Sequence, residues 1–306
     1  MAWYLYLQGG LCRKVFNQLL SLIIECVRDR FYDAVEKINN FISSADCFED
    51  ILAQIGIIPE AVGHDSTEEK LFAKASDAVL SRVFRELGLK STVLSKRSDS
   101  ADVIAQSNIH GYTLVADAKA FRLSRTAKNQ KDFKVGSLSA WRKDADYAVL
   151  CSPYFQYPRN QSQIYAQAVD GDVCLLSWEH LLLLMQHGIK ESELLNLSKL
   201  WGIGSVMARK TTVAEKKKCF IREFDGHILS TVGLSQMDFD RSLSISIDRI
   251  RGRGHSEKTY LEKERGTICS YSREQAVNEL IKAKKIDEKI RRIDLYVKEV
   301  GVCTMS

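Results

Sequence analysis

The sequence predicts an α/β fold in which a mixed β-sheet is flanked by helices, with additional helical regions at both ends. Three observations predict it. Short apolar or β-branched runs alternate with helical patterns between residues 63 and 200. Apolar residues recur at spacings of three and four on either side of that segment. The chain has only 3 prolines, so its helices can run long.

The N-terminal region, residues 1–62, is expected to be helical. From residue 11 onward its apolar positions follow helical spacing: Phe16, Leu19, Leu20, Ile23, Ile24, Val27, Phe31, Val35, Ile38 and Phe41. Helices with this pattern bury one face against a neighbour. We therefore interpret the region as an outer helical layer or as a dimer element.

The central region, residues 63–200, carries the predicted sheet. Its first helix opens with Ser66 and Glu69, which have the spacing of a capping box. His180 and His187 lie seven apart on its last helix without an acid or cysteine at metal-ligand spacing, so we interpret them as packing or surface residues. We expect helices at 67–87, 160–169 and 178–187, and strands at 102–106, 112–119, 146–152 and 173–177.

The C-terminal region, residues 201–306, is charged and mostly helical, and no clear linker separates the three regions, so we expect one compact unit. Ser272 and Gln275 form a second capping box, at the start of a lysine-rich helix. The glycine-interleaved arginines of Arg249–Arg253 fit a DNA contact and a plain loop equally well. Residues 242–247 alternate like a strand, and their state is left open.

The strongest chemical signal lies at the end of the strand that begins at Tyr112. Asp117 and Lys119 close this strand, and because alternate strand residues point to one face, their side chains converge. Asp102 opens an apolar run that is expected to be the antiparallel neighbour, with 108–111 as the turn. Two carboxylates and an ammonium group suit phosphodiester hydrolysis. Mg2+ takes carboxylate oxygens, and a lysine can orient or deprotonate the attacking water.

A dense basic run follows this strand. Basic side chains occupy positions 119, 122, 125, 128, 131 and 134, against the single acid Asp132. Steps of three wind around an α-helix instead of forming a stripe, so a segment that follows a phosphate backbone fits better than a surface helix. A solvated charged loop is the alternative. The residues expected to contact DNA are Arg122, Arg125, Lys128, Asn129, Gln130 and Lys131, whose two amides can read adenine edges.

The run from Leu114 to Val135 resembles the catalytic and DNA-reading segment of the HindIII family of type II restriction endonucleases. The resemblance extends over residues 55–185 and thins out beyond them. It implies a restriction-endonuclease-like core in a homodimeric, Mg2+-dependent enzyme of the PD-(D/E)xK superfamily. Such an enzyme cuts double-stranded DNA at the palindrome AAGCTT, after the first A, and leaves 5′ overhangs. The other matching pieces are 56–61, 66–72, 102–105, 146–150, 155–158 and 177–181.

The resemblance also implies roles for individual residues. Asp102 and Asp117 would bind the metal, together with the carbonyl of Ala118. Lys119 would act on the water, and Asp132 is a further acid close to the site. We expect two Mg2+ ions in each active site.

Two positions qualify this assignment. Ala101 stands where the superfamily pattern has proline, which weakens the motif without removing a ligand. Some superfamily members bring a helical glutamate to the metal, and Glu69 is the candidate for that accessory role. We favour capping as the role of Glu69.

Composition agrees with a globular DNA-binding enzyme. The hydrophobic fraction of 45% over 306 residues supports a real core, and the mild net charge of +5 hides the local basic run. The 8 cysteines are scattered without a Cys-x-x-Cys pair, which favours reduced thiols in the cytoplasm and excludes a zinc ribbon. The first residues lack a signal-peptide pattern and no apolar stretch is long enough to span a bilayer, so we expect no membrane partner.

Two other functions remain open at this point. One is a repair or resolving nuclease of the same superfamily with looser sequence demands. The other is a DNA-binding protein with an inactive nuclease core, which the presence of Asp102, Asp117 and Lys119 disfavours. The sequence has no Gly-x-Ser-x-Gly elbow and no phosphate-cradling loop, which disfavours a serine-nucleophile or ATP-driven enzyme.

Overall fold

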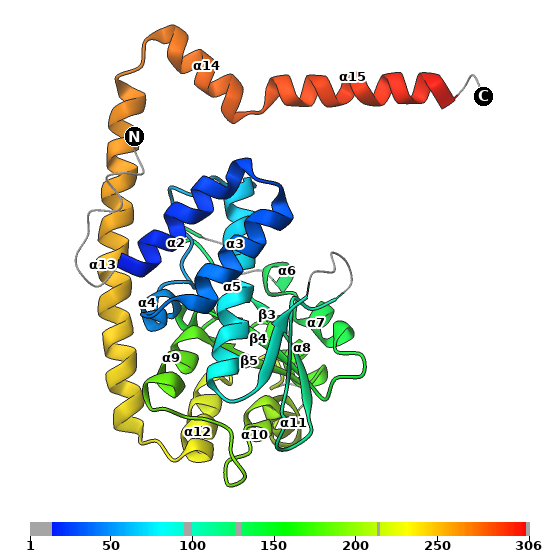
Figure 1. The fold of residues 1–306 in the computed structure, drawn as a ribbon, viewed down its shortest axis with the longest axis vertical. Helices are drawn as coiled ribbons and strands as arrows, with labels where there is room; N and C mark the ends of the chain where they lie inside the picture. The colour runs from blue at the N-terminus through cyan, green and yellow to red at the C-terminus, as the bar shows by residue number, and fades with distance from the viewer. Residues whose placement is uncertain (1–13, 95–99, 126–129, 213–214, 304–306) are drawn as a thin grey trace. The chain divides into compact units, whose positions relative to one another are not determined.

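The computed structural model describes residues 14–94, 100–125, 130–212 and 215–303 (Figure 1). Contacts divide the chain into two compact units, one running to His255 and the other beginning at Ser256. The first unit contains the whole β-sheet. Among the described residues, no helix has the length and apolar character needed to cross a membrane.

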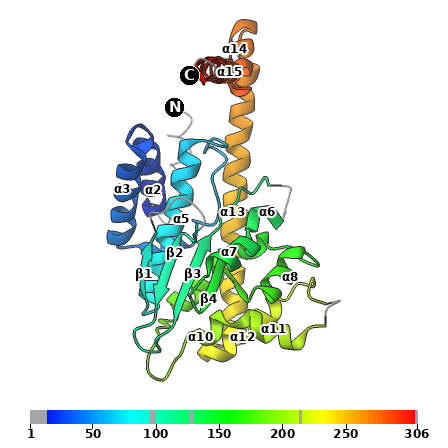
Figure 2. The same ribbon diagram turned by 90° about the vertical axis from the view of Figure 1, so that its right-hand side faces the viewer.

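Five strands form one mixed sheet in the order β1-β2-β3-β4-β5, and Figure 2 shows β1 to β4 side by side. β1, β2 and β3 pair in antiparallel fashion, whereas β3, β4 and β5 run parallel. The four predicted strands are confirmed, with ends that differ by at most one residue. β1 was not predicted, because it is short and half polar. The strands are β1 (Lys90–Val93), β2 (Val103–Gln106), β3 (Thr113–Ala118), β4 (Tyr147–Ser152) and β5 (Val173–Ser177).

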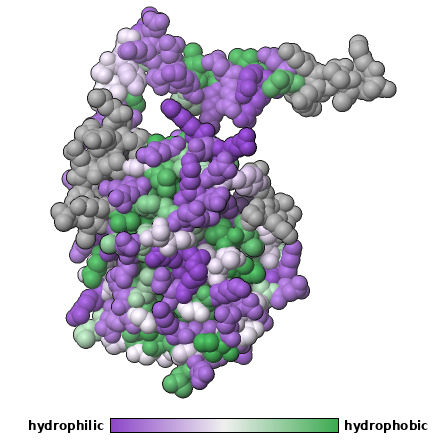
Figure 3. Space-filling view, in the orientation of Figure 1, coloured by the Kyte–Doolittle hydropathy of each residue, from purple (hydrophilic) through white to green (hydrophobic). Residues whose placement is uncertain are grey.

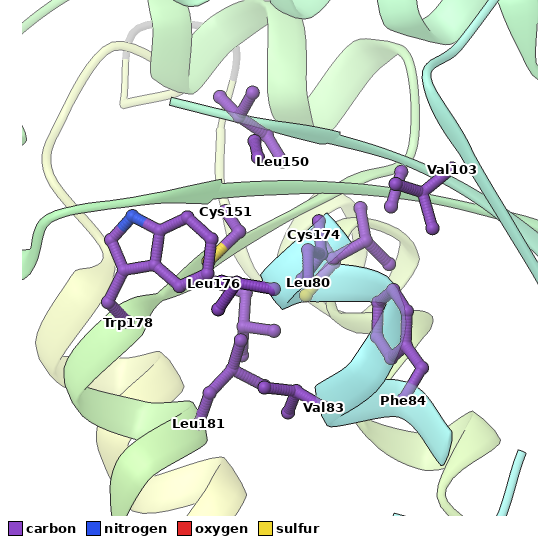
Figure 4. Close-up of a cluster of buried hydrophobic side chains, with 14 of the residues drawn as sticks. Leu80, Val83, Phe84, Val103, Leu150, Cys151, Cys174, Leu176, Trp178 and Leu181 are labelled. Carbon is purple, nitrogen blue, oxygen red and sulfur yellow. The ribbon is translucent and has the colours of Figure 1, made fainter. Parts of the chain in front are cut away.

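Helices pack against the sheet and fix its position. α5 (Thr67–Glu86) contacts β1, β2 and β3, and α9 (Trp178–Gln186) contacts β5. Figure 4 shows side chains of α5 and α9 in one cluster beneath the strands, among them Leu80, Phe84 and Leu181, all fully buried. Burying each such side chain contributes about 1.5–3 kcal/mol, so the face that α5 turns toward the sheet is strongly determined.

Four further helices also contact the sheet and complete the core. All three helices predicted for the central region are confirmed as α5, α8 and α9, whereas α7 was not predicted. The additional helices are α7 (Val135–Trp141), α8 (Gln163–Asp170), α10 (Ser198–Trp201) and α11 (Ile203–Lys210).

The N-terminal region is helical, as predicted. α3 (Phe31–Ser44) packs against α5, and α2 (Lys14–Glu25) contacts α3, α5 and α4 (Phe48–Leu52). The apolar positions of α2 are buried at helical spacing, including Phe16 and Ile23. This arrangement agrees with an outer helical layer, and a role in dimer formation stays a prediction.

The C-terminal region contains α12 (Ile221–Val232), α13 (Gln236–Cys269), α14 (Arg273–Ala283) and α15 (Ile286–Cys303). Residues 242–247 lie inside α13 and are helical, with Ser242 and Ser246 buried at a spacing of four. The predicted capping box is confirmed at the start of α14, between Ser272 and Gln275. Hydrophilic residues cover most of the face drawn in Figure 3.

The arginine and glycine tract also lies inside α13, so the plain loop is wrong, whereas a DNA contact stays a prediction. Each glycine costs a helix about 1 kcal/mol, which is too little to break a helix of 34 residues. Arg253 is only 4% exposed, and its guanidinium carbon lies 5.3 Å from the centre of the Phe16 ring. Arg251 is exposed and pairs with Asp248 at 3.1 Å. At least Arg253 therefore serves packing within the first unit.

Candidate active site

The β2–β3 hairpin brings the two predicted acids together. Val103 pairs with Ala116, so one further step of the register sets Asp102 opposite Asp117. The turn is closed by a hydrogen bond from the Ser107 backbone N–H to the Tyr112 carbonyl. Gly111 in this turn has a φ of 71°, a conformation that favours glycine. The predicted antiparallel pairing and its turn are confirmed.

Lys119 converges on Asp117, as strand alternation predicted. Its Nζ lies 2.5 Å from Asp117 Oδ2, and the carboxylate side chain is only 3% exposed. The attraction between the two charges is strong here, because little water remains around the pair to screen it.

The backbone at Lys119 is fixed from two sides. Its N–H donates to the Cys151 carbonyl at 2.7 Å, and its carbonyl accepts from Trp178 Nε1 at 2.9 Å. The indole ring sits against Gly56, where an added Cβ would lie 2.6 Å from Trp178 Cδ1. A glycine is therefore required at position 56 for the ring to reach Lys119.

A third acid, Asp77 of α5, completes the cluster, and sequence reasoning missed it. One oxygen from each of Asp77, Asp102 and Asp117 lies within 4.8 Å of the other two. Asp77 is only 3% exposed although its side chain is an ionisable carboxyl group. The available signal was its position on the buried face of α5, since an acid on an apolar helix face is rarely tolerated without a partner or a function.

A second lysine, Lys74, lies one helical turn before Asp77, and it was also missed. Its Nζ donates to Asp77 Oδ2 at 3.1 Å and, in a very short contact, to Asp102 Oδ1. The lysine therefore connects α5 to the start of β2. The cluster as a whole comprises three carboxylates and two ammonium groups.

The electrostatics of the cluster favour an added cation. Burial raises the pKa of the Asp77 carboxyl well above its ordinary value, and the nearby Asp102 charge raises it further, while Lys74 opposes the shift. Burial also raises the pKa of Asp117, and Lys119 opposes that shift. The charged forms of both acids are thus costly without further positive charge. Three carboxylate donors are the ligand set that hard divalent cations prefer, so these residues fit such an ion.

The cluster forms one wall of a cleft of about 860 Å3. Ala118 lies between Asp117 and Lys119 and lines the same cleft, as do Lys70 and Lys134. Another part of the lining comes from the N-terminal helical layer, including Tyr32 and Asn39 of α3. The acids are therefore accessible to a ligand even though two of their side chains are almost fully buried.

The chain that forms this cleft matches a known nuclease family over most of its length. The profile of the HindIII restriction endonuclease family matches residues 30–295. The chain is also 40% identical over 290 residues to the type II restriction enzyme HindIII of Haemophilus influenzae, a match covering 94% of this chain and 97% of that protein. The chain belongs to the HindIII restriction endonuclease family. It is accordingly a type II restriction endonuclease, a hydrolase that acts on DNA, and its acid cluster agrees with the divalent-metal dependence general in this family.

In this HindIII-family chain, Glu69 lies outside the three-acid cluster. Its backbone N–H donates to Ser66 Oγ at 3.1 Å, so the predicted N-cap of α5 is confirmed. In a full capping box the Glu69 side chain would accept from the Ser66 N–H. Here Glu69 Oε2 accepts instead from the N–H of the preceding residue, Asp65, at 2.7 Å. Its other oxygen pairs with Arg122. The acid that α5 brings to the cluster is Asp77, about two turns further along.

Arg122 and Arg125, two of the predicted DNA contacts, fold back onto the protein. Arg122 also donates to the Val62 carbonyl at 2.7 Å. Arg125 pairs with Asp132 at 2.5 Å, and its guanidinium carbon lies 3.7 Å from the centre of the Phe121 ring. Their side chains are only 14% and 13% exposed. Both arginines therefore organise the loop after β3 in this HindIII-family fold.

The other residues of the basic run are placed differently. Asp132 lies on α6 (Gln130–Phe133) and is not part of the acid cluster. Gln130 and Lys131 are exposed at the start of the same helix. Lys128 and Asn129 lie outside the described residues.

His180 is a packing residue, as predicted. It is 1% exposed, its Nδ1 lies 3.0 Å from Ser177 Oγ, and its Nε2 lies 2.8 Å from Asp225 Oδ1. Ser177 accepts a hydrogen bond from the His180 N–H and so caps α9. Asp225 comes from α12, far away in the sequence, which is why local spacing did not reveal it. His187 is exposed.

Proposed function

We propose that this chain is a Mg2+-dependent homodimer of the cytoplasm that cuts double-stranded DNA at the palindrome AAGCTT, after the first A, leaving 5′ overhangs. The observation that carries the proposal is the meeting of Asp77, Asp102 and Asp117 beside Lys119, at the wall of an open cleft. Metal-assisted phosphodiester hydrolysis uses this combination of metal ligands and a positioned cation.

In this proposal the three carboxylates hold Mg2+, with two ions in each active site, and the Ala118 carbonyl is a further ligand. Bound there, Mg2+ would draw charge from a phosphoryl oxygen and acidify a nearby water. The buried setting of Asp77 and Asp117 supports strong binding, because a cation relieves the cost of their charges.

Lys119 acts on the attacking water. Its ammonium group is held beside Asp117 and its backbone is fixed by Trp178 and Cys151, so it approaches the scissile phosphate from a fixed direction. It can orient or deprotonate the water and offset charge developing on the phosphoryl oxygens.

DNA contacts come from the exposed part of the basic run. Gln130 and Lys131 are exposed, Lys134 lines the cleft, and Lys128 and Asn129 belong to the same segment. Arg122 and Arg125 shape this segment through their pairs with Glu69 and Asp132. In this arrangement Asp132 acts on the DNA-binding segment through Arg125. A two-fold dimer would place one such cleft on each strand of a palindrome.

Digestion of plasmid DNA with Mg2+, followed by sequencing of the product ends, tests the proposal. We expect discrete fragments that begin with AGCT at their 5′ ends. A smear or cleavage confined to branched DNA would favour a repair or resolving nuclease. Tight, specific binding without cleavage would favour an inactive nuclease core.

A further inference from the structure

In the acid cluster, one oxygen of each carboxylate binds a lysine ammonium group. Lys119 binds Asp117 Oδ2, and Lys74 binds Asp77 Oδ2 and Asp102 Oδ1. The second oxygen of each of these carboxylates accepts no hydrogen bond from any described residue. Each acid thus has one oxygen held by an ammonium group and one that is left to a ligand.

This division defines two cation positions. The free oxygens of Asp102 and Asp117 can take one divalent ion while both lysines stay in place. The region between Asp77 and Asp102 is different, because the Lys74 ammonium already lies there. A second ion in that region competes with Lys74, because two cations held by neighbouring oxygens of the same carboxylates repel each other strongly.

We propose that Lys74 is a positioning residue that fills the second cation position in the DNA-free enzyme. The second ion enters when a DNA phosphate in the cleft offers Lys74 another partner. The proposal rests on the metal-dependent function proposed above. Binding of both ions then depends on DNA. By thermodynamic linkage, the second ion increases the affinity for DNA by the same factor by which DNA increases the affinity for that ion.

The two lysines differ in ways that suit Lys74 to this role. Lys119 is held by its backbone bonds to Cys151 and Trp178, and its side chain is 16% exposed. Lys74 lies on α5 where the helix borders the cleft, and its side chain is 27% exposed. A lysine side chain has several rotatable bonds, so Lys74 can turn from the carboxylates to a phosphate without movement of its helix.

Charge also favours an exchange at Lys74. With all acids ionised, three carboxylates and two ammonium groups carry a net charge of −1. One divalent ion brings the cluster to +1, which a single phosphodiester neutralises. A second ion in the absence of DNA would bring the cluster, with Lys74 in place, to +3 in a partly buried site, and such uncompensated charge is unfavourable.

Calorimetric titration with Ca2+, a hard cation with the same oxygen preference, tests the proposal. The wild-type protein is expected to bind one ion per protomer alone and a second when an AAGCTT duplex is present. Lys74→Met is expected to bind two ions without DNA, with the second dissociation constant lowered at least about tenfold. Lys74→Arg keeps the cation and should behave as wild type.

Lys70→Met is the matched control. Lys70 lies one turn earlier on α5, is exposed and lines the same cleft, so this change removes the same charge without touching the acids. Its isotherm should match that of wild type. Lys74→Gln replaces Lys74→Met if the methionine variant does not fold by circular dichroism.

The inference is overturned if wild type fills two equal sites without DNA, or if Lys74→Met and wild type give the same isotherm. Failure of the proposed function looks different. In that case neither wild type nor any variant takes up Ca2+, with or without the duplex.

Discussion

Two buried polar groups in this molecule contain aspartates and have opposite roles: the hydrogen-bonded group of Ser177, His180, Asp225 and Tyr154, and the cluster of Asp77, Asp102 and Asp117. Asp225 has both oxygens satisfied, Oδ1 by His180 at 2.8 Å and Oδ2 by the Tyr154 hydroxyl at 2.6 Å. In the Asp77, Asp102 and Asp117 cluster, beside an open cleft, each carboxylate has one oxygen that accepts no hydrogen bond from the part of the chain that the structure describes. The Ser-His-Asp grouping is therefore structural here, whereas the three acids from α5, β3 and the start of β2 are the proposed active site. Accessible carboxylate oxygens without a hydrogen-bond partner distinguish a candidate binding site from a structural group, whereas the residue types alone do not.

The largest expected effect is at Asp117. Asp117→Asn removes a proposed metal ligand and the partner of Lys119, so we expect cleavage to fall at least about a thousandfold. DNA binding without metal should be kept, because the exposed basic residues are unchanged. Gel shifts and single-turnover cleavage of one duplex measure both. Cleavage at the wild-type rate would remove Asp117 from the mechanism.

Asp225→Asn is the matched change in the other cluster. It weakens the bond to His180, so we expect a loss of about 1–3 kcal/mol in the free energy of unfolding. The folded fraction should cut DNA within about threefold of wild type, since no part of this cluster lines the cleft. Urea unfolding and cleavage at saturating Mg2+ measure the two effects. A large loss of activity with unchanged stability would contradict the division drawn here.

Asp77→Asn sharpens the comparison through stability. The folded-state pKa of Asp77 is raised above its unfolded value, so its stabilising contribution is present at low pH and is lost as pH rises. Without metal, the variant should be more stable than wild type at pH 8, by about 1 kcal/mol, and this advantage should shrink at pH 4. Unfolding in the presence of a chelator at both pH values measures this. A variant less stable at pH 8 would show that the acid supports the fold.

The smallest effects concern the basic run. Lys131→Met removes an exposed charge, so we expect weaker DNA binding, a salt slope reduced by about 1 and unchanged stability. Arg125→Met breaks the Asp132 pair and the ring contact, and should cost about 1 kcal/mol of stability. Salt-dependent binding and urea unfolding separate the two. Equal salt slopes for both variants would mean that Arg125 contacts DNA directly.

Asp102, Asp117 and Lys119 were predictable because their arrangement is local. Strand alternation aligns Asp117 with Lys119, and a short hairpin sets Asp102 opposite Asp117. Asp77 was not predictable in this way. Its place depends on which face α5 turns toward the sheet, and that is decided by distant packing of residues such as Phe84.

The basic run shows the limit of counting charges. Arg122 and Arg125 were predicted as DNA contacts from their spacing; each pairs with an acid of the chain, Glu69 and Asp132, and their contact with DNA stays a prediction. Arg122 and Glu69 are far apart in the sequence, so no local sequence pattern predicts their pairing. The spacing of Arg125 and Asp132 was visible, yet only the fold of the loop after β3 brings them together.

The most direct test of the central claim is single-turnover cleavage of an AAGCTT duplex by Asp77→Asn across a Mg2+ titration. If acids from α5, β3 and the start of β2 hold the cation together, the variant should cleave more slowly than wild type. Its half-saturating Mg2+ concentration should be at least about tenfold higher. A rate and a Mg2+ dependence equal to those of wild type would show that α5 contributes no acid to the reaction.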